Sequence, residues 1–480
     1  MPALIARFPL NDGGMFMDMT RELAANQYLL PATTAYNGLD LPYAYPPFGF
    51  YLTALLADFG RIPLLSLFLW LPALFAILAI PVFYLLARAL LADDLHAALA
   101  TLFFALTPGS YFWHLMGGGI TRATGFLFLL LTAVYTLRLF QGQKPAHVFA
   151  VIAFASLAVL SHPEVGLQTA GLCAVFWLFH GRTKRGTLQA LFVVAGVLIF
   201  TAPWWGTVLA QHGLSPYLSA LQTGQHADVD WLELLVDLFR PGELIPILFL
   251  LRLLGFVYAM WKRQYILLAM IIIPAVFDPR SASSIGFLAM NMLAALAVAQ
   301  FLPALIGRLR NVEPNEAFDQ RTRVFGIITL TTLLFVQCGL RNYTLINTTL
   351  SIEEREAMTW LSENVPPGRE FYLVTGRMYS MSDPAQEWFP TLTGQRSQTT
   401  LQGLEWSLGP RFTERLDDLT VLQACETISC VEAWSTRTGL SYDHLWVVKS
   451  IESLAGELAA SQNYRLVFET ESLAVYTRIK

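Results

Sequence analysis

The sequence predicts an α-helical polytopic membrane protein with a small water-soluble α/β domain at its C-terminus. Of its 480 residues, 55% are hydrophobic and 14% are charged, whereas about 25% are charged in an ordinary soluble domain. Apolar segments recur between residues 61 and 341, and the charge changes sign near residue 350. Residues 352–480 hold 11 Lys and Arg against 18 Asp and Glu, whereas residues 1–351 hold 20 against 17. The net charge of −4 gives no indication of nucleic-acid binding.

Residues 1–60 are expected to form an extramembrane loop with a short amphipathic helix. Met15, Met19 and Leu23 recur every four residues after Asp12. This spacing predicts a helix lying on the membrane surface, with Asp12 as its N-cap. Pro46 and Pro47 exclude a helix immediately before the first long apolar segment.

Residues 61–341 are expected to form a transmembrane domain of about ten helices, since a spanning helix needs about 20 mostly apolar residues. The candidate segments are 64–90, 95–112, 120–139, 147–161, 164–180, 187–205, 243–261, 264–278, 285–306 and 324–341.

The basic residues predict the orientation. Alternate loops hold twelve of them, and the loops between hold three: Arg122, Arg240 and Arg280. The positive-inside rule places the first set in the cytoplasm of a bacterial-type cell. Residues 1–60 and the tail, 352–480, then lie outside the plasma membrane. A loop exported at the very N-terminus leads us to expect one further hydrophobic helix encoded upstream of Met1.

The tail alternates helical and strand patterns, which predicts an extracytoplasmic α/β domain. We expect helices at 352–364, at 411–423 and up to about 461, and strands at 371–376 and 444–450, with a terminal strand pair. Cys425 and Cys430 lie five residues apart and would form a disulfide in an oxidising compartment; the alternative is two unrelated thiols.

Polar residues at the outer ends of the apolar segments are the candidates for chemistry, because polar groups at membrane depth line functional cavities. They are Asp12, His114, Arg122, His162, Glu164, Asp278 and Arg280. A carboxylate can deprotonate an acceptor hydroxyl or hold a metal that does so, and an arginine can hold a phosphate. This inventory suits sugar transfer from a lipid-linked phosphate donor.

Each candidate also has a structural alternative. Asp12 could serve only as an N-cap, and His162 with Glu164 could simply close a helical hairpin. Arg280 could pair with Asp278. Arg252 lies within an apolar segment and must face protein or water.

The order of Asp12, amphipathic helix, tyrosine-rich loop, YPP and first long apolar segment resembles the first luminal loop of GT-C glycosyltransferases. The tail segment EWFPTLTGQRSQTTLQGLEW is similar to the WWDYG region of the oligosaccharyltransferase catalytic subunit. The resemblance implies a polyprenyl-phosphate- or diphosphate-linked sugar donor, Asp12 as the catalytic base, and a glycan, protein or lipid acceptor. In that family a transmembrane helix precedes this loop, and we expect its counterpart upstream of Met1. No acidic pair occurs in residues 113–122, which argues against a metal-dependent reaction, although a divalent metal stays open.

The resulting hypothesis is an inverting membrane glycosyltransferase, with Asp12 as general base and Arg122 or Arg280 holding the donor phosphate. Donor lipid would enter between the helices from the membrane. The alternatives are a polytopic transporter or flippase, which predicts inverted repeats, and a non-catalytic envelope assembly protein, for which Asp12 is dispensable.

Overall fold

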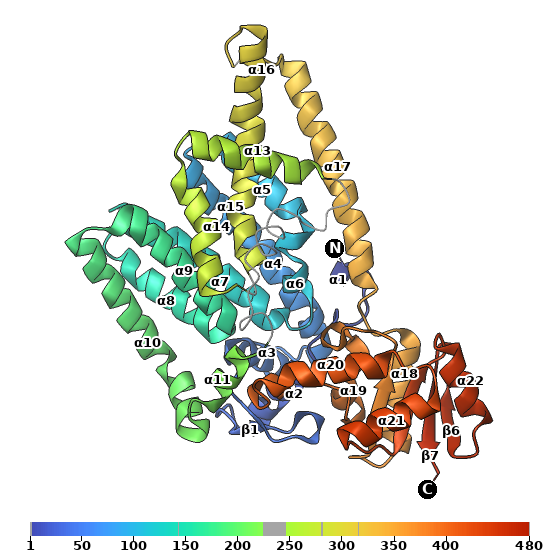
Figure 1. Ribbon diagram of the computed structural model, residues 1–480. Helices are drawn as coiled ribbons and strands as arrows, with labels where there is room; N and C mark the ends of the chain where they lie inside the picture. Colours follow the sequence, from blue (N-terminus) through green and yellow to red (C-terminus); the bar gives the residue numbers. More distant parts are fainter. Residues whose placement is uncertain (1, 143, 224–245, 280–281, 315, 480) are drawn as a thin grey trace.

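A computed structural model describes residues 2–142, 144–223, 246–279, 282–314 and 316–479. Figure 1 shows a helical bundle with a smaller domain at one end, reached through the long helix α17 (Gln320–Ile346). The main bundle helices are α4 (Leu64–Leu91), α5 (Asp94–Leu106), α7 (Gly119–Phe140), α8 (His147–Ser161), α9 (Pro163–Phe176), α10 (Lys184–His212), α13 (Ile247–Trp261), α14 (Tyr265–Phe277), α15 (Ala282–Leu296) and α16 (Leu302–Arg310). All ten expected segments contain helix, and the expected fold class, helical with a C-terminal sheet domain, is confirmed.

Helix length and apolar composition support a multi-pass membrane protein. Within the described ranges, five continuous helices are long and apolar enough to cross a membrane. The count becomes six if α13 and α14, bent by 116° at the break between them, form one broken span. That all ten segments cross the membrane stays a prediction.

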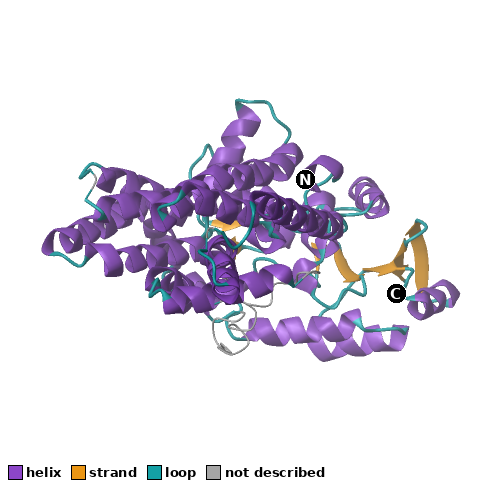
Figure 2. Ribbon diagram, turned by 90° about the horizontal axis from the view of Figure 1, so that it is seen from above, coloured by secondary structure: helices purple, strands orange, loops and turns teal. Residues whose placement is uncertain are grey.

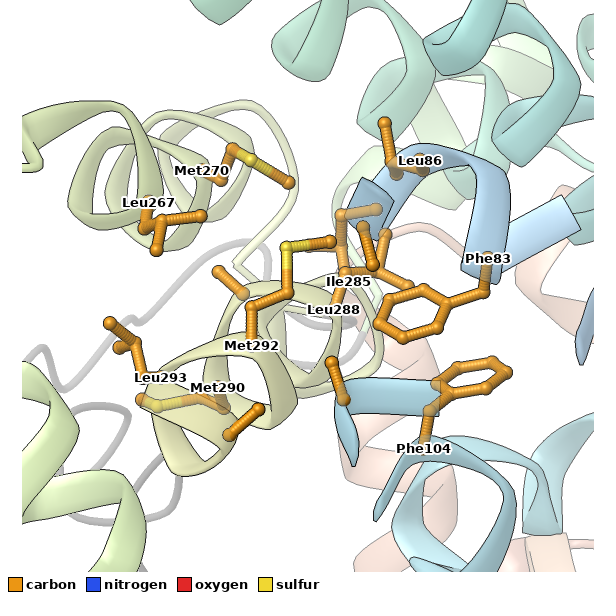
Figure 3. Close-up of a cluster of buried hydrophobic side chains, with 14 of the residues drawn as sticks. Phe83, Leu86, Phe104, Leu267, Met270, Ile285, Leu288, Met290, Met292 and Leu293 are labelled. Carbon is orange, nitrogen blue, oxygen red and sulfur yellow. The ribbon is translucent and has the colours of Figure 1, made fainter. Parts of the chain in front are cut away.

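The bundle core is built by close packing of apolar side chains from α4, α5, α14 and α15, shown in Figure 3. Phe83 stacks on Phe104 with ring centroids 4.3 Å apart, and Leu288 is fully buried. A β-carbon on Gly255 of α13 would lie 1.9 Å from the Leu293 carbonyl oxygen, so glycine lets the two helix backbones meet. Such packing is the main attraction between helices in a membrane.

Arg252 of α13 faces protein rather than lipid. It is fully buried and donates hydrogen bonds to Thr107 Oγ1 (3.2 Å) and Asn291 Oδ1 (3.1 Å). Its guanidinium also lies 5.1 Å from the centre of the Phe287 ring. The charge therefore ties α13 to the end of α5 and to α15.

The tail domain has a five-stranded mixed sheet in the order β4-β3-β5-β7-β6, seen beside its helices in Figure 2. The strands are β3 (Glu370–Val374), β4 (Arg396–Ser397), β5 (His444–Val448), β6 (Tyr464–Glu469) and β7 (Leu473–Arg478). β3 pairs in parallel with β4 and β5, and β5-β7-β6 is antiparallel. The helices are α18 (Ile352–Asn364), α19 (Pro384–Thr393), α20 (Arg411–Gln423), α21 (Ile428–Thr438) and α22 (Glu452–Ala460). Cys425 and Cys430 are disulfide-bonded, with their Cα atoms 5.6 Å apart.

The apolar face of α2 (Gly14–Ala25), the helix expected on the membrane surface, is instead covered by protein. Met15, Met19 and Leu23 are buried, and α2 contacts both α3 (Phe48–Asp58) and α19 of the tail domain. The prediction that Asp12 caps this helix is also wrong, since the helix begins later. Gly13 occupies the N-cap position with φ +131°, which favours glycine, and the Asp12 side chain turns toward α7.

Candidate active site

Asp12 and Arg122 form an ion pair where the N-terminal loop meets the start of α7. One guanidinium nitrogen of Arg122, Nη2, donates to both Asp12 carboxylate oxygens, Oδ1 at 3.0 Å and Oδ2 at 2.9 Å. Arg122 Nε donates to the Trp113 carbonyl oxygen at 3.0 Å. The third nitrogen, Nη1, makes no hydrogen bond within the described part of the chain. It is therefore available for a further anionic oxygen.

The glycine run before α7 lets the N-terminal loop approach. The backbone N–H of Gly118 donates to Asp12 Oδ1 at 3.0 Å, and that of Gly117 donates to the Leu10 carbonyl oxygen at 2.7 Å. A β-carbon on Gly117 would lie 1.8 Å from the Asp12 carbonyl oxygen. These contacts explain why glycine is needed at positions 117 and 118, where a side chain would collide with the N-terminal loop. The Asp12 and Arg122 side chains keep 11% and 18% of their surface exposed.

The turn between α8 and α9 lies beside this pair. The His162 ring contacts the edge of Tyr45, with centroids 5.8 Å apart, and the Tyr45 hydroxyl lies 3.5 Å from Thr121 Oγ1. Glu164 places negative charge near Arg122 and Tyr45. The Tyr45 ring also contacts Trp406 of the tail domain at 6.0 Å. The expected candidates Asp12, Arg122, His162 and Glu164 thus gather at one end of the bundle.

His114 has a structural environment. Its Nδ1 lies 3.2 Å from the Ser110 carbonyl oxygen, and its ring packs 4.3 Å from Phe126. Burial and the nearby positive charge of Arg122 lower the pKa of His114 to about 3. The imidazole is therefore neutral at physiological pH.

Asp278 lies at the C-terminal end of α14. It is fully buried at the end of α14 and accepts a hydrogen bond from Gln168 Nε2 at 2.9 Å. Gln168 lies one helical turn beyond Glu164 along α9, so Asp278 lies deeper along that helix. Arg280, the other expected phosphate ligand, lies outside the described residues. Among those described, no three His, Cys, Asp or Glu side chains are grouped as metal ligands.

Glu387 is a site residue that the sequence interpretation missed. It projects from α19 of the tail domain, and its Oε1 accepts the backbone N–H groups of Gly13 and Met15, both at 3.2 Å. Burial and then the negative charge of Asp12 raise the pKa of Glu387 to about 8. The available signal was a carboxyl group followed directly by Trp388 and Phe389, because an acid that is buried together with large apolar residues needs a hydrogen-bond partner.

The helical bundle and the sheet-bearing tail domain together make up the fold of a multi-pass membrane protein. No protein-family model and no curated protein matches the sequence. The fold is similar to ArnT from Cupriavidus metallidurans, a GT-C glycosyltransferase, in its apo crystal structure. The sequences are 15% identical with a TM-score of 0.53, over 98% of this chain and 94% of that chain. The structure of ArnT bound to undecaprenyl phosphate gives 14% identity and a TM-score of 0.50, over 99% and 96%. This likeness confirms the expected fold, a polytopic helical bundle with a C-terminal sheet domain.

Proposed function

We propose that this protein is a membrane glycosyltransferase that moves a sugar from a polyprenyl-phosphate or polyprenyl-diphosphate donor to an extracytoplasmic acceptor. The observation that carries the proposal is the partly exposed Asp12–Arg122 ion pair at one end of a bundle whose fold is similar to that of ArnT. The structural neighbour that binds undecaprenyl phosphate supports a lipid-linked donor.

The pair supplies the two groups that such a reaction needs. The Asp12 carboxylate accepts the proton of the acceptor hydroxyl while the hydroxyl oxygen attacks the anomeric carbon of the donor sugar. The bond from that carbon to the phosphate oxygen breaks, and the polyprenyl phosphate, or the polyprenyl diphosphate when that is the donor, leaves with the bonding electrons. One displacement of this kind inverts the configuration at the anomeric carbon.

Arg122 would hold the phosphate through Nη1 while Nη2 keeps the carboxylate in place. Arg280 is the second proposed phosphate ligand, from its place in the sequence. The twelve-to-three distribution of basic residues in the loops supports an extracytoplasmic position for this end of the bundle and for the tail domain, in the plasma membrane.

The test is sugar transfer by full-length protein in membranes. Undecaprenyl-phosphate and undecaprenyl-diphosphate sugars, radiolabelled in the sugar, would be supplied with cell-envelope extract as the source of acceptor. Arg122→Lys keeps the charge but loses the planar fork, so we expect kcat/KM to fall by about 10- to 100-fold, mainly through KM. Arg88→Lys, an exposed residue of α4 paired with Asp94, is the matched control and should behave as wild type.

Two outcomes would contradict the proposal, and a third would contradict the role of Arg122. A wild-type protein that transfers no sugar from any of these donors is not this kind of enzyme. Movement of the intact donor across the membrane without transfer would favour a flippase instead. Wild-type KM in Arg122→Lys would remove Arg122 from donor binding.

A further inference from the structure

We infer that the tail domain positions the base, because Glu387 and Trp388 of α19 hold the main chain on both sides of Asp12. This inference rests on the proposed function, in which Asp12 is the base. It gives the tail domain a part in catalysis besides any contact with the acceptor. Glu387 and Trp388 act through the main chain, so they are positioning residues.

Three hydrogen bonds carry the inference. Glu387 Oε1 accepts the N–H groups of Gly13 and Met15, each at 3.2 Å. Trp388 Nε1 donates to the Asn11 carbonyl oxygen at 2.9 Å. The three main-chain partners are residues 11, 13 and 15, so adjacent residues of one tail helix hold the chain immediately before and after Asp12.

Close packing between α19 and the loop around Asp12 prevents the loop from shifting. A β-carbon on Gly14 would lie 2.3 Å from the Glu387 carbonyl oxygen, and one on Gly13 would lie 3.1 Å from the Trp388 ring. The Tyr36 hydroxyl donates to that same Glu387 carbonyl at 2.7 Å, and Trp388 is fully buried. The loop and α19 therefore meet main chain to main chain.

The chemistry of Glu387 suits a hydrogen-bond acceptor that lies close to another acid, Asp12. The N-terminal N–H groups of α2 have no partners within the helix and need an acceptor. Because burial favours the protonated form, the side chain offers a carbonyl-type oxygen without a second negative charge next to Asp12. Glutamine offers the same kind of oxygen, which separates the acceptor role from an acid–base role.

Four variants test the inference. Glu387→Ala removes the acceptor, and Glu387→Gln keeps it. Trp388→Phe removes one hydrogen bond while keeping an aromatic ring. Trp446→Phe is its control: Trp446 is also fully buried, contacts Phe389 at 5.9 Å, and its N–H has no hydrogen-bond partner within the described ranges.

We expect Glu387→Ala to lower kcat by about 100-fold with KM for the donor nearly unchanged, because misplacing a reacting group by about 1 Å costs this much. Glu387→Gln should stay within about threefold of wild type, since Gln is an equivalent acceptor. Trp388→Phe should lower kcat by about tenfold, which corresponds to the free energy of one hydrogen bond. Trp446→Phe should lower kcat by less than about twofold.

Hydrogen exchange provides a readout that does not depend on transfer. The amide hydrogens of Gly13 and Met15 should exchange faster in Glu387→Ala than in wild type and return to wild-type protection in Glu387→Gln. If the wild type transfers no sugar, the proposed function fails, and exchange alone decides whether Glu387 holds the loop. Wild-type kcat in Glu387→Ala, or no rescue by Gln, would overturn the inference even if Asp12 remains the base. If Glu387→Ala does not fold, the comparison of kcat between Trp388→Phe and Trp446→Phe tests the inference, and equal kcat values in the two variants would overturn it.

Discussion

Gly118 offers a direct way to disturb the Asp12–Arg122 pair without changing either charge. A β-carbon at this position would lie 2.8 Å from Asp12 Oδ2, 2.9 Å from Arg122 Nη2 and 3.1 Å from Arg122 Nη1. Ordinary contacts of a β-carbon are 3.4–4 Å, so Gly118→Ala forces the two side chains apart by roughly half an ångström to one ångström. The backbone of Gly118 is right-handed helical, with φ −62°, which alanine adopts without strain.

A displacement of this size at a reacting carboxylate predicts a loss of about 100-fold in kcat, or about 2.7 kcal/mol of transition-state stabilisation. The assay is sugar transfer in membranes, with thermal denaturation in detergent to show that the protein still folds. Gly206→Ala is the control, because a β-carbon there meets nothing within 4 Å. Wild-type turnover by Gly118→Ala, at normal stability, would refute the catalytic role given to this geometry.

Three further predictions concern stability and topology. Glu387 has a pKa of about 8 in the folded protein against an ordinary value of 4.5, so between these values the folded state holds a proton that the unfolded chain has lost. The contribution of Glu387 to the free energy of unfolding is therefore full below about pH 4.5 and declines by about 1.4 kcal/mol per pH unit until about pH 8. The Tm of the wild type should fall relative to that of Glu387→Gln over this pH range, and a difference in Tm that stays constant with pH would contradict the prediction. Arg252→Met leaves buried hydrogen-bond acceptors on α5 and α15 without this donor and should lower stability by about 1–3 kcal/mol per group, whereas an unchanged Tm would show that the buried contacts stabilise nothing. In intact cells a membrane-impermeant thiol reagent should label Glu471→Cys, an exposed tail position, and not Lys144→Cys, and the reverse pattern would invert the topology.

Much of the fold follows from hydropathy and periodicity. The ten apolar segments all contain helix, and the terminal strand pair appears as β6 and β7. Helix α19 could not be read in this way. It contains Pro390, which usually ends a helix, and its residues 384–390 are all buried, polar and apolar alike, so hydropathy does not mark which of them face protein. The amphipathic pattern of α2 was real, but hydropathy cannot distinguish a face that meets lipid from one that meets α19.

The candidate site was only partly predictable. Asp12 and Arg122 could be singled out because polar residues are few at the ends of the apolar segments. Their pairing joins residues 110 positions apart and depends on glycines 117 and 118 letting two backbones touch. The contact with Glu387 spans more than 370 positions. No local pattern encodes such a contact, because it exists only once the tail domain docks on the N-terminal loop.

The central claim is that Asp12 is the base in sugar transfer from a polyprenyl-linked donor, and Asp12→Asn tests it most directly. Asparagine retains an oxygen for the Gly118 N–H but cannot take up the acceptor's proton. Asp94→Asn, an exposed partner of Arg88, is the control. We predict that Asp12→Asn folds normally and transfers at least about 100-fold more slowly than wild type, the scale for losing a general base. Transfer at the wild-type rate by Asp12→Asn would contradict the account.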